Sequence, residues 1–252
     1  MTGGCSLQPG EDGRADIDLD TAKYLLYGLE RIEGWGIDGH LAQLFLSLNR
    51  FHKQHRLYGN LFEIGVHHGR TAILLALMSA IGEVAVFVDL FDRQSENLDL
   101  SGRGDRAIFE SNLAQWAPRR SIKIVQDNSI DLDFGSVAEL ADGIRFAHVD
   151  GAHYRDAVLN DLRKTQDVLI KGGIVIVDDF FHSGFPGVNE ACNAYLESRP
   201  PGSLAPAAMG RNKLILTTPE WAEALVAHLA AWQHGARHVA FHGHDVLCLD
   251  PH

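Results

Sequence analysis

The sequence is poor in cysteine and short of positive charge, and both shortages narrow what the protein can be. Its only cysteines, Cys5, Cys192 and Cys248, are odd in number, far apart and outside any CxxC spacing. This pattern predicts no disulfide framework and favours a reducing compartment, so we expect a cytoplasmic protein. Lys and Arg number 22 against 33 Asp and Glu, a net charge of -11. Nucleic acids and anionic membranes are bound by clustered Lys and Arg, so we expect neither as a partner.

Long apolar runs are also missing. No run approaches the roughly 20 residues that a membrane helix requires. The first residues, MTGGCSLQPGEDGRADID, contain no apolar segment of the kind found in secretory signals, and we expect residues 1–19 to be a flexible polar leader. With 252 residues, 46% of them hydrophobic, the chain has the size and composition of one soluble α/β domain. We place that domain at residues 20–252.

Residues 20–58 have a helical pattern. TAKYLLYGLERI and HLAQLFLSLNRFHKQ both repeat apolar residues at intervals of three and four, and the glycine-containing EGWGIDG separates them. We predict an N-terminal helical cap on a core at residues 59–252. Two roles stay open for this cap, namely covering a substrate and forming the subunit contact of a homo-oligomer.

From residue 59 onward, short β-rich runs alternate with helical stretches. This alternation predicts βαβ units and a mostly parallel sheet. Runs such as VFV and IVIV are apolar without alternation, as in strands that are covered on both faces. We therefore predict an α/β, Rossmann-like, doubly wound sheet of seven strands with helices on both faces. HVAFHGHDVLCLD is expected to form an antiparallel last strand.

Five consecutive predicted strands end in an acidic residue. Because ligands of parallel sheets bind at the carboxyl ends of the strands, these residues are candidates for a site. They are Glu63, Asp89, Asp127, Asp150 and the adjacent pair Asp178 and Asp179.

The turn after the first of these strands, within FEIGVHHGRTA, holds Gly65 and Gly69. Glycine permits a positive φ and lets a ligand approach the backbone closely. The dinucleotide fingerprint G-x-G-x-x-G is absent, since Glu63 stands where its first glycine would be. A carboxylate there would repel a pyrophosphate, which binds bare amides at a helix N-terminus. It suits a cationic ligand such as the sulfonium S-adenosylmethionine, and it disfavours a nicotinamide-dependent dehydrogenase.

Together with VFVD and QDNS, this turn resembles the class I S-adenosylmethionine-dependent methyltransferases. The resemblance implies that Asp89 binds the two ribose hydroxyls, with Asp92 as its near competitor. It also implies that QDNS lies near the adenine, although a simple turn is an equal reading of that stretch. The implied cofactor-binding residues are Glu63, Gly65, His67, Gly69, Thr71, Asp89, Asp127, Asn128, Ser129 and Asp150.

FAHVDGAHY and LIKGGIVIVDDFF resemble a narrower group, the metal-dependent O-methyltransferases of small molecules such as catechols, macrolide sugars and antibiotic intermediates. The resemblance implies that Asp150, Asp178 and Asp179 hold a divalent metal. It places a base at His153, where the catechol branch has lysine, and His182 is the second candidate. Three neighbouring carboxylates would repel one another without a cation, and oxygen ligands favour Mg²⁺, with Mn²⁺ or Ca²⁺ as alternatives.

The sequence thus predicts an enzyme that transfers a methyl group from S-adenosylmethionine to a hydroxyl of a small molecule, with a metal assisting. A sugar or natural-product intermediate is the acceptor expected by analogy. Three alternatives remain, namely a metal-independent methyltransferase, a nicotinamide-dependent dehydrogenase and a non-catalytic cofactor-binding protein. Residues 92–106 form a long polar segment that we predict to be a lid over the cofactor.

Overall fold

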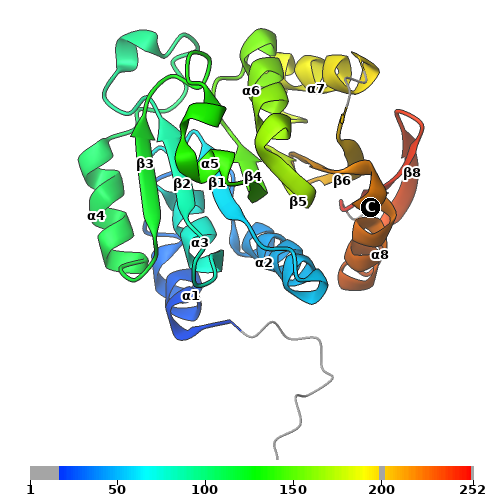
Figure 1. Ribbon diagram of the computed structural model, residues 1–252, viewed down its shortest axis with the longest axis horizontal. Coiled ribbons are helices and arrows are strands. Elements are labelled where there is room, and N and C mark those ends of the chain that lie inside the picture. Colours follow the sequence, from blue (N-terminus) through cyan, green and yellow to red (C-terminus); the bar gives the residue numbers. More distant parts are fainter. Residues whose placement is uncertain (1–16, 199–201, 251–252) are drawn as a thin grey trace, which may run out of the picture.

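The computed structural model describes residues 17–198 and 202–250, so nearly all of the predicted leader, residues 1–19, lies outside the described residues. One mixed sheet runs through the molecule in the order β3-β2-β1-β4-β5-β7-β6-β9-β8 (Figure 1). The strands are β1 (Asn60–Ile64), β2 (Ala85–Asp89), β3 (Ile122–Gln126), β4 (Ile144–Val149), β5 (Leu169–Val177), β6 (Ala205–Gly210), β7 (Lys213–Thr217), β8 (Arg237–Phe241) and β9 (His244–Cys248).

The first five strands are parallel, and β7 runs antiparallel to both of its neighbours, β5 and β6. Each parallel strand therefore delivers its carboxyl end to the same edge of the sheet. The chain crosses from β1 outward to β3 and then returns past β1 to β4. Crevices for ligands form at such a reversal of strand order.

The α/β, doubly wound, mostly parallel prediction is confirmed, but the predicted count of seven strands is wrong, because the described residues form nine. The missed strand, β6, reads APAAMG, and its small residues and proline have low strand propensity. The predicted last strand is a hairpin of β8 and β9, which turns at His242 and Gly243, both with positive φ. Within it β8 is antiparallel to β9, while β9 is parallel to β6.

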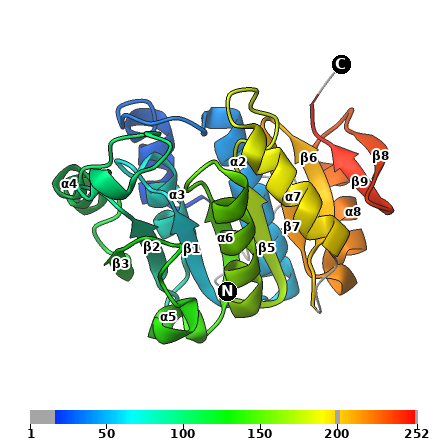
Figure 2. The same ribbon diagram turned by 90° about the horizontal axis from the view of Figure 1, so that it is seen from above.

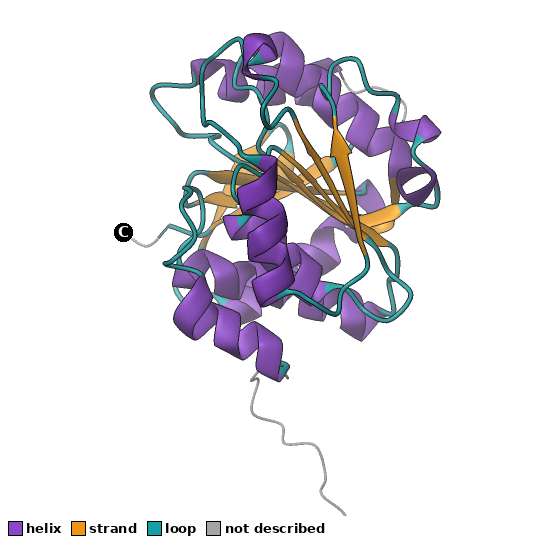
Figure 3. Ribbon diagram, turned by 90° about the vertical axis from the view of Figure 1, so that its left-hand side faces the viewer, coloured by secondary structure: helices purple, strands orange, loops and turns teal. Residues whose placement is uncertain are grey.

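Helices cover both faces of the sheet, giving three layers (Figures 2 and 3). On one face lie α1 (Leu19–Lys23), a π-helix (Tyr24–Gly28), α2 (Gly39–His55), α3 (Arg70–Met78), α4 (Arg106–Trp116) and α8 (Ala222–Trp232). On the other lie α5 (Ala138–Ala141), α6 (Arg155–Val168) and α7 (Pro186–Ser198). Residues of one strand alternate between the two cores. In β2, Phe87 packs into the first core, whereas Val86 and Val88 pack into the second.

A buried ion pair fixes α2 against the amino ends of the strands. Arg145, near the start of β4, donates two hydrogen bonds of 2.8 Å to the carboxylate of Glu83. It also donates to Asn49 Oδ1 at 2.9 Å and lies 3.1 Å from His52 Nδ1, both on α2. None of these four side chains is among the described ones that have a buried polar atom without a partner. In the described part of the chain, no helix is long and apolar enough to cross a membrane.

Candidate functional site

A cavity of about 580 Å³ lies along the carboxyl ends of β1, β2, β4 and β5. Its volume is within the range of pockets that bind cofactors and small molecules. The cavity runs from Asp89 and Asp127 at one end, past Gly65, to Asp150 and Asp179 at the other. All of the residues predicted for the site line it except Gly69. They are Glu63, Gly65, His67, Thr71, Asp89, Asp127, Asn128, Ser129, Asp150, His153, Asp178, Asp179 and His182.

The turn between β1 and α3 has a shape that only glycine allows at position 65. Gly65 has a φ of +79°, and a Cβ on it would lie 1.8 Å from the carbonyl oxygen of Asp150. Asp89 holds the same turn from β2, because its carboxylate accepts hydrogen bonds from the backbone N–H groups of Val66 and His67 at 2.7 and 2.9 Å. Gly69 has a φ of +95° and is the N-cap of α3, so its role is in shaping the backbone.

The three residues predicted to lie near an adenine form one wall of the cavity and have partners within the protein. Asp127 pairs with Arg93 at 2.9 Å and accepts a hydrogen bond from the N–H of Asn128. The Ser129 hydroxyl donates to the buried carboxylate of Asp161 at 3.1 Å. Burial raises the pKa of Asp161 to about 6, against the opposing effect of the Ser129 hydrogen bond.

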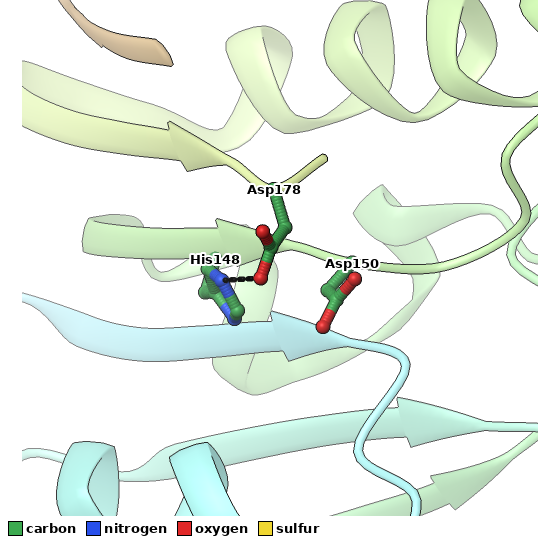
Figure 4. Close-up of side chains that lie close together, drawn as sticks. All are labelled: His148, Asp150 and Asp178. Atoms are coloured by element: carbon green, nitrogen blue, oxygen red, sulfur yellow. Dashed lines mark ion pairs between the residues drawn. The ribbon is translucent and has the colours of Figure 1, made fainter. Parts of the chain in front are cut away.

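Glu63, His148, Asp178 and Lys213 form a chain of ionisable groups beneath the cavity, which we call the inner network. Their side chains are almost completely buried. Glu63 Oε1 lies 2.8 Å from His148 Nδ1, and His148 Nε2 lies 3.4 Å from Asp178 Oδ2 (Figure 4). Lys213 Nζ donates to the other Asp178 oxygen, Oδ1. The Glu63 carboxylate, predicted to face a cofactor ammonium, is thus engaged by a histidine from β4.

Each carboxylate of the inner network lies beside a basic side chain. Burial raises the pKa of Glu63 to about 7. Burial also acts to lower the pKa of His148, but the carboxylates of Asp178 and Glu63 outweigh it and raise that pKa to about 10. One proton between Glu63 and His148 leaves this pair neutral, whichever side chain holds it. Burial opposes it, but the contact with His148 and the ammonium of Lys213 lower the pKa of Asp178 to about 2.

Asp99, Asp150, His153 and Asp179 form a second group at the cavity, which we call the outer cluster. His153 Nδ1 lies 3.0 Å from Asp99, and His153 Nε2 lies 3.1 Å from Asp179 and 3.8 Å from Asp150. Burial acts to lower the pKa of His153, but the hydrogen bonds to these carboxylates raise it to about 11. Burial and the charge of Asp178 raise the pKa of Asp150 to about 6. With all four groups ionised, three carboxylates against one imidazolium leave two negative charges in excess.

The backbone separates Asp178 from Asp179. Asp179 has a φ of +59°, a conformation that side chains rarely adopt, and the Asn212 amide donates to its Oδ1 at 2.6 Å. Among the described residues, two groups have ligand atoms close enough to share a metal ion, and both contain Asp150. One adds His148 and Asp178, and the other adds His153 and Asp179. Asp178 and Asp179 share no such group. The metal set of Asp150, Asp178 and Asp179 therefore stays a prediction, and the geometry assigns its two adjacent acids to different groups.

The two candidate bases lie against one aromatic ring. The Phe185 ring stacks on His153 at 4.0 Å and on His182 at 4.5 Å between centroids. His153 has carboxylates at both ring nitrogens, as described above. His182 is exposed, and within the described residues its one hydrogen bond is from the Gly184 N–H to Nδ1, at 3.2 Å. The two histidines therefore differ in how freely they can exchange a proton.

The segment predicted to be a lid contributes to the cavity wall and is tied down at two places. Arg93 pairs with Asp127, and Asp99 accepts a hydrogen bond from the His153 N–H at 2.7 Å. The segment thus links the predicted adenine end to the outer cluster. Its movement over a cofactor stays a prediction.

Four residues of the site were missed in the sequence. His148 could have been found, because it stands two positions before Asp150, at the end of the same strand. Trp35, 70% exposed, lines the cavity with its ring centroid 5.2 Å from that of His67, and its only signal was a lone aromatic between two glycines. Asp99 and Lys213 come from a loop and from a distant strand start, and no local pattern marks them.

Comparison with known proteins finds a methyltransferase family that matches the central part of this chain. Residues 62–180 match a family described as "Methyltransferase domain". A search of curated protein sequences found no match. The matched segment runs from β1 to the turn after β5, and so includes every strand end that lines the cavity.

Solved structures with this fold include several O-methyltransferases. The O-methyltransferase NovP aligns with a TM-score of 0.61 and 15% identity over 72% of this chain and 81% of its own. CalS11, a TDP-rhamnose 3′-O-methyltransferase of calicheamicin biosynthesis, aligns with a TM-score of 0.51 and 18% identity over 78% and 86%. TomG of Streptomyces achromogenes, involved in tomaymycin synthesis, aligns with a TM-score of 0.54 and 15% identity over 81% and 92%. At these identities the likeness establishes the fold.

Proposed function

We propose that this chain, which matches a methyltransferase-domain family over residues 62–180 and shares its fold with solved O-methyltransferases, transfers a methyl group from S-adenosylmethionine to a hydroxyl of a small molecule. The observation that carries the proposal is the continuous cavity. It joins the Gly65 turn and Asp89 to a cluster of carboxylates and histidines without an intervening wall. A donor at one end and an acceptor at the other would therefore meet inside one enclosed space.

The donor half is supported by the β1–α3 turn. Gly65 lines the cavity, and Asp89 fixes the amides that follow it. Asp89 already accepts hydrogen bonds from the backbone N–H groups of Val66, His67 and Phe91. Because a carboxylate has about four acceptor sites, Asp89 can still accept a ribose hydroxyl. TomG, which shares this fold, was solved in complex with S-adenosylmethionine.

The acceptor half is supported by the outer cluster. A divalent cation bound there would lower the pKa of the acceptor hydroxyl and stabilise the alkoxide. The donor set fits such an ion, because the ligand atoms of two carboxylates and an imidazole lie close enough to share it. Asp150 and Asp179 would orient the acceptor oxygen, and the stacked rings of Phe185 and His182 would limit its movement.

Between the two candidate bases, the contacts favour His182. Both nitrogens of His153 face carboxylates, whereas Nε2 of His182 has no partner among the described residues and faces solvent. We propose that His182 takes the hydroxyl proton and passes it to water. While Nδ1 accepts from the Gly184 N–H, neutral His182 carries its ring proton on Nε2. The contact with Gly184 must therefore open and the ring proton move to Nδ1 before Nε2 can accept the hydroxyl proton. His182→Gln should then lower kcat at least tenfold and leave S-adenosylhomocysteine binding unchanged.

Incubation with methyl-labelled S-adenosylmethionine and a panel of sugar, catechol and polyketide alcohols tests the function directly. The expected products are a labelled methyl ether and S-adenosylhomocysteine in equal amounts. EDTA should abolish turnover, and added Mg²⁺ or Mn²⁺ should restore it. Full activity in EDTA would instead identify a metal-independent methyltransferase of the same fold.

A further inference from the structure

We infer that the divalent cation of the proposed reaction binds to Asp150, His153 and Asp179. Asp178 is not a ligand, because its carboxylate is already paired with the ammonium of Lys213. This inference rests on the proposed function and specifies its metal centre. It differs from the set of Asp150, Asp178 and Asp179 that the sequence predicts, and it gives roles to His153 and Lys213.

Charge balance is the first argument. In the inner network, Asp178 already has a buried cationic partner, because Lys213 Nζ donates to its Oδ1. A metal at Asp178 would bring a second cation close to this buried ammonium, and such an arrangement is costly. In the outer cluster, three carboxylates surround one imidazole with no Lys or Arg among them, and a divalent cation would offset their repulsion.

Access is the second argument. Asp178 is 3% exposed, and Gly36 packs closely against its carboxylate. A Cβ at Gly36 would lie 2.7 Å from Asp178 Oδ2 and 3.6 Å from Lys213 Nζ, so only glycine fits there. The Asp150 and Asp179 side chains, by contrast, are 27% and 18% exposed at the cavity. A hydrated ion arriving from the cavity therefore reaches these carboxylates first.

The orientation of His153 is the third argument. Metal-binding histidines commonly donate their second ring N–H to a carboxylate, which fixes the ring. Asp99 accepts at Nδ1 of His153 at 3.0 Å, so Nε2 is directed toward Asp179 and Asp150. On binding, the Nε2 proton would leave to solvent and that nitrogen would become the third ligand. One imidazole beside two carboxylates favours Mn²⁺ over Mg²⁺, because Mg²⁺ prefers an all-oxygen shell.

Mn²⁺ binding to the full chain tests this assignment without any acceptor. We would titrate Mn²⁺ by calorimetry, with and without S-adenosylhomocysteine, and record the electron spin echo of the bound ion. The wild type should bind one Mn²⁺, more tightly than Mg²⁺, with modulation from a directly bound ¹⁴N. Asp179→Asn should weaken binding at least tenfold, and His153→Gln should do the same and remove the ¹⁴N signal.

The matched control removes the inner pair together. Asp178→Asn combined with Lys213→Met leaves no unpaired buried charge and should keep Mn²⁺ affinity within about threefold. A loss as large as that of Asp179→Asn would overturn the inference. If the double variant does not fold, the ¹⁴N signal of the wild type decides alone, because bound Mn²⁺ without it would equally overturn the assignment.

Failure of the inference and failure of the proposed function give different results. A wild type that binds S-adenosylhomocysteine but no Mn²⁺ would overturn the metal site and leave the methyltransferase proposal standing. A wild type that binds Mn²⁺ with a ¹⁴N signal but no S-adenosylhomocysteine would support the metal site and contradict the proposed function.

Discussion

The two ends of β4 each bury charged side chains, but these side chains are paired differently at the two ends. At the amino end, Arg145 is 2% exposed and donates to Glu83 and Asn49, so that the charges pair within the core and face no cavity. At the carboxyl end, the inner network pairs each carboxylate with a basic side chain, whereas in the outer cluster three carboxylates share one imidazole beside the cavity. Buried charge alone therefore does not mark a functional site here. The functional site is marked instead by carboxylates beside a cavity that outnumber their basic partners.

The largest expected effect comes from breaking the balanced end. Arg145→Met leaves Glu83 as a buried carboxylate without its cation, and we expect a loss of about 3–5 kcal/mol in the free energy of unfolding. Urea unfolding followed by circular dichroism measures it. The control, Arg145→Met with Glu83→Gln, removes the pair and should recover most of the loss. Equal losses in the single and double variants would mean that packing, and not charge balance, dominates.

The pH dependence of stability extends this comparison to Asp161, a buried carboxylate in contact with no cation among the described residues. Burial raises the pKa of Asp161 to about 6, from an ordinary value of 3.8. The folded state then holds this proton more tightly than the unfolded state does, so stability should fall as the pH rises from about 4 to about 6. The loss amounts to about 2–3 kcal/mol. Asp161→Asn should remove this fall, as urea unfolding at pH 4 and pH 7.5 would reveal. An unchanged pH dependence in the variant would assign the fall to other groups.

Backbone geometry at the open end provides the next test. Gly65→Ala places a Cβ 1.8 Å from the Asp150 carbonyl oxygen, so we expect S-adenosylhomocysteine affinity to fall at least about 100-fold, or about 2.7 kcal/mol. Gly82 is a matched control, since its φ of +89° is equally demanding but no atom lies within 4 Å of its Cβ position. Gly82→Ala should cost about 1 kcal/mol of stability and leave affinity unchanged. Equal affinities for the two variants would remove the Gly65 turn from the proposed binding site.

The smallest expected effect is at Asp89. Asp89→Asn removes one charged acceptor from the backbone of the turn and from the proposed ribose contact. We expect affinity for S-adenosylhomocysteine to fall about tenfold, measured by calorimetry. Asp92→Asn is the control, since Asp92 is exposed and absent from the cavity wall. A larger effect at Asp92 would reverse the assignment of the two acids.

Sequence patterns predicted what depends on local order and missed what depends on pairing across the sheet. The parallel strands and their acidic ends follow from apolar runs that stop at a carboxylate, and these residues do gather around one cavity. Strand β6 was missed because its stability comes from its neighbours β7 and β9 and not from its own residues. Lys213 and Asp99 were missed for a related reason, since each finds its partner at least 35 residues away.

The separation of Asp178 from Asp179 could not be predicted either. Adjacent acids at a strand end can face one ion once the strand has ended, and the sequence gives no φ for Asp179. Its left-handed conformation sends the two carboxylates to different groups. The cost of that conformation is accepted where surrounding contacts fix it, here the hydrogen bond from Asn212.

Calorimetric titration of the purified chain with S-adenosylhomocysteine tests the central claim most directly, because it needs neither the acceptor nor the metal. The account predicts saturable binding of one molecule per chain with a Kd in the micromolar range, and no heat of binding with NAD⁺. A folded protein that binds NAD⁺ and not S-adenosylhomocysteine would contradict it.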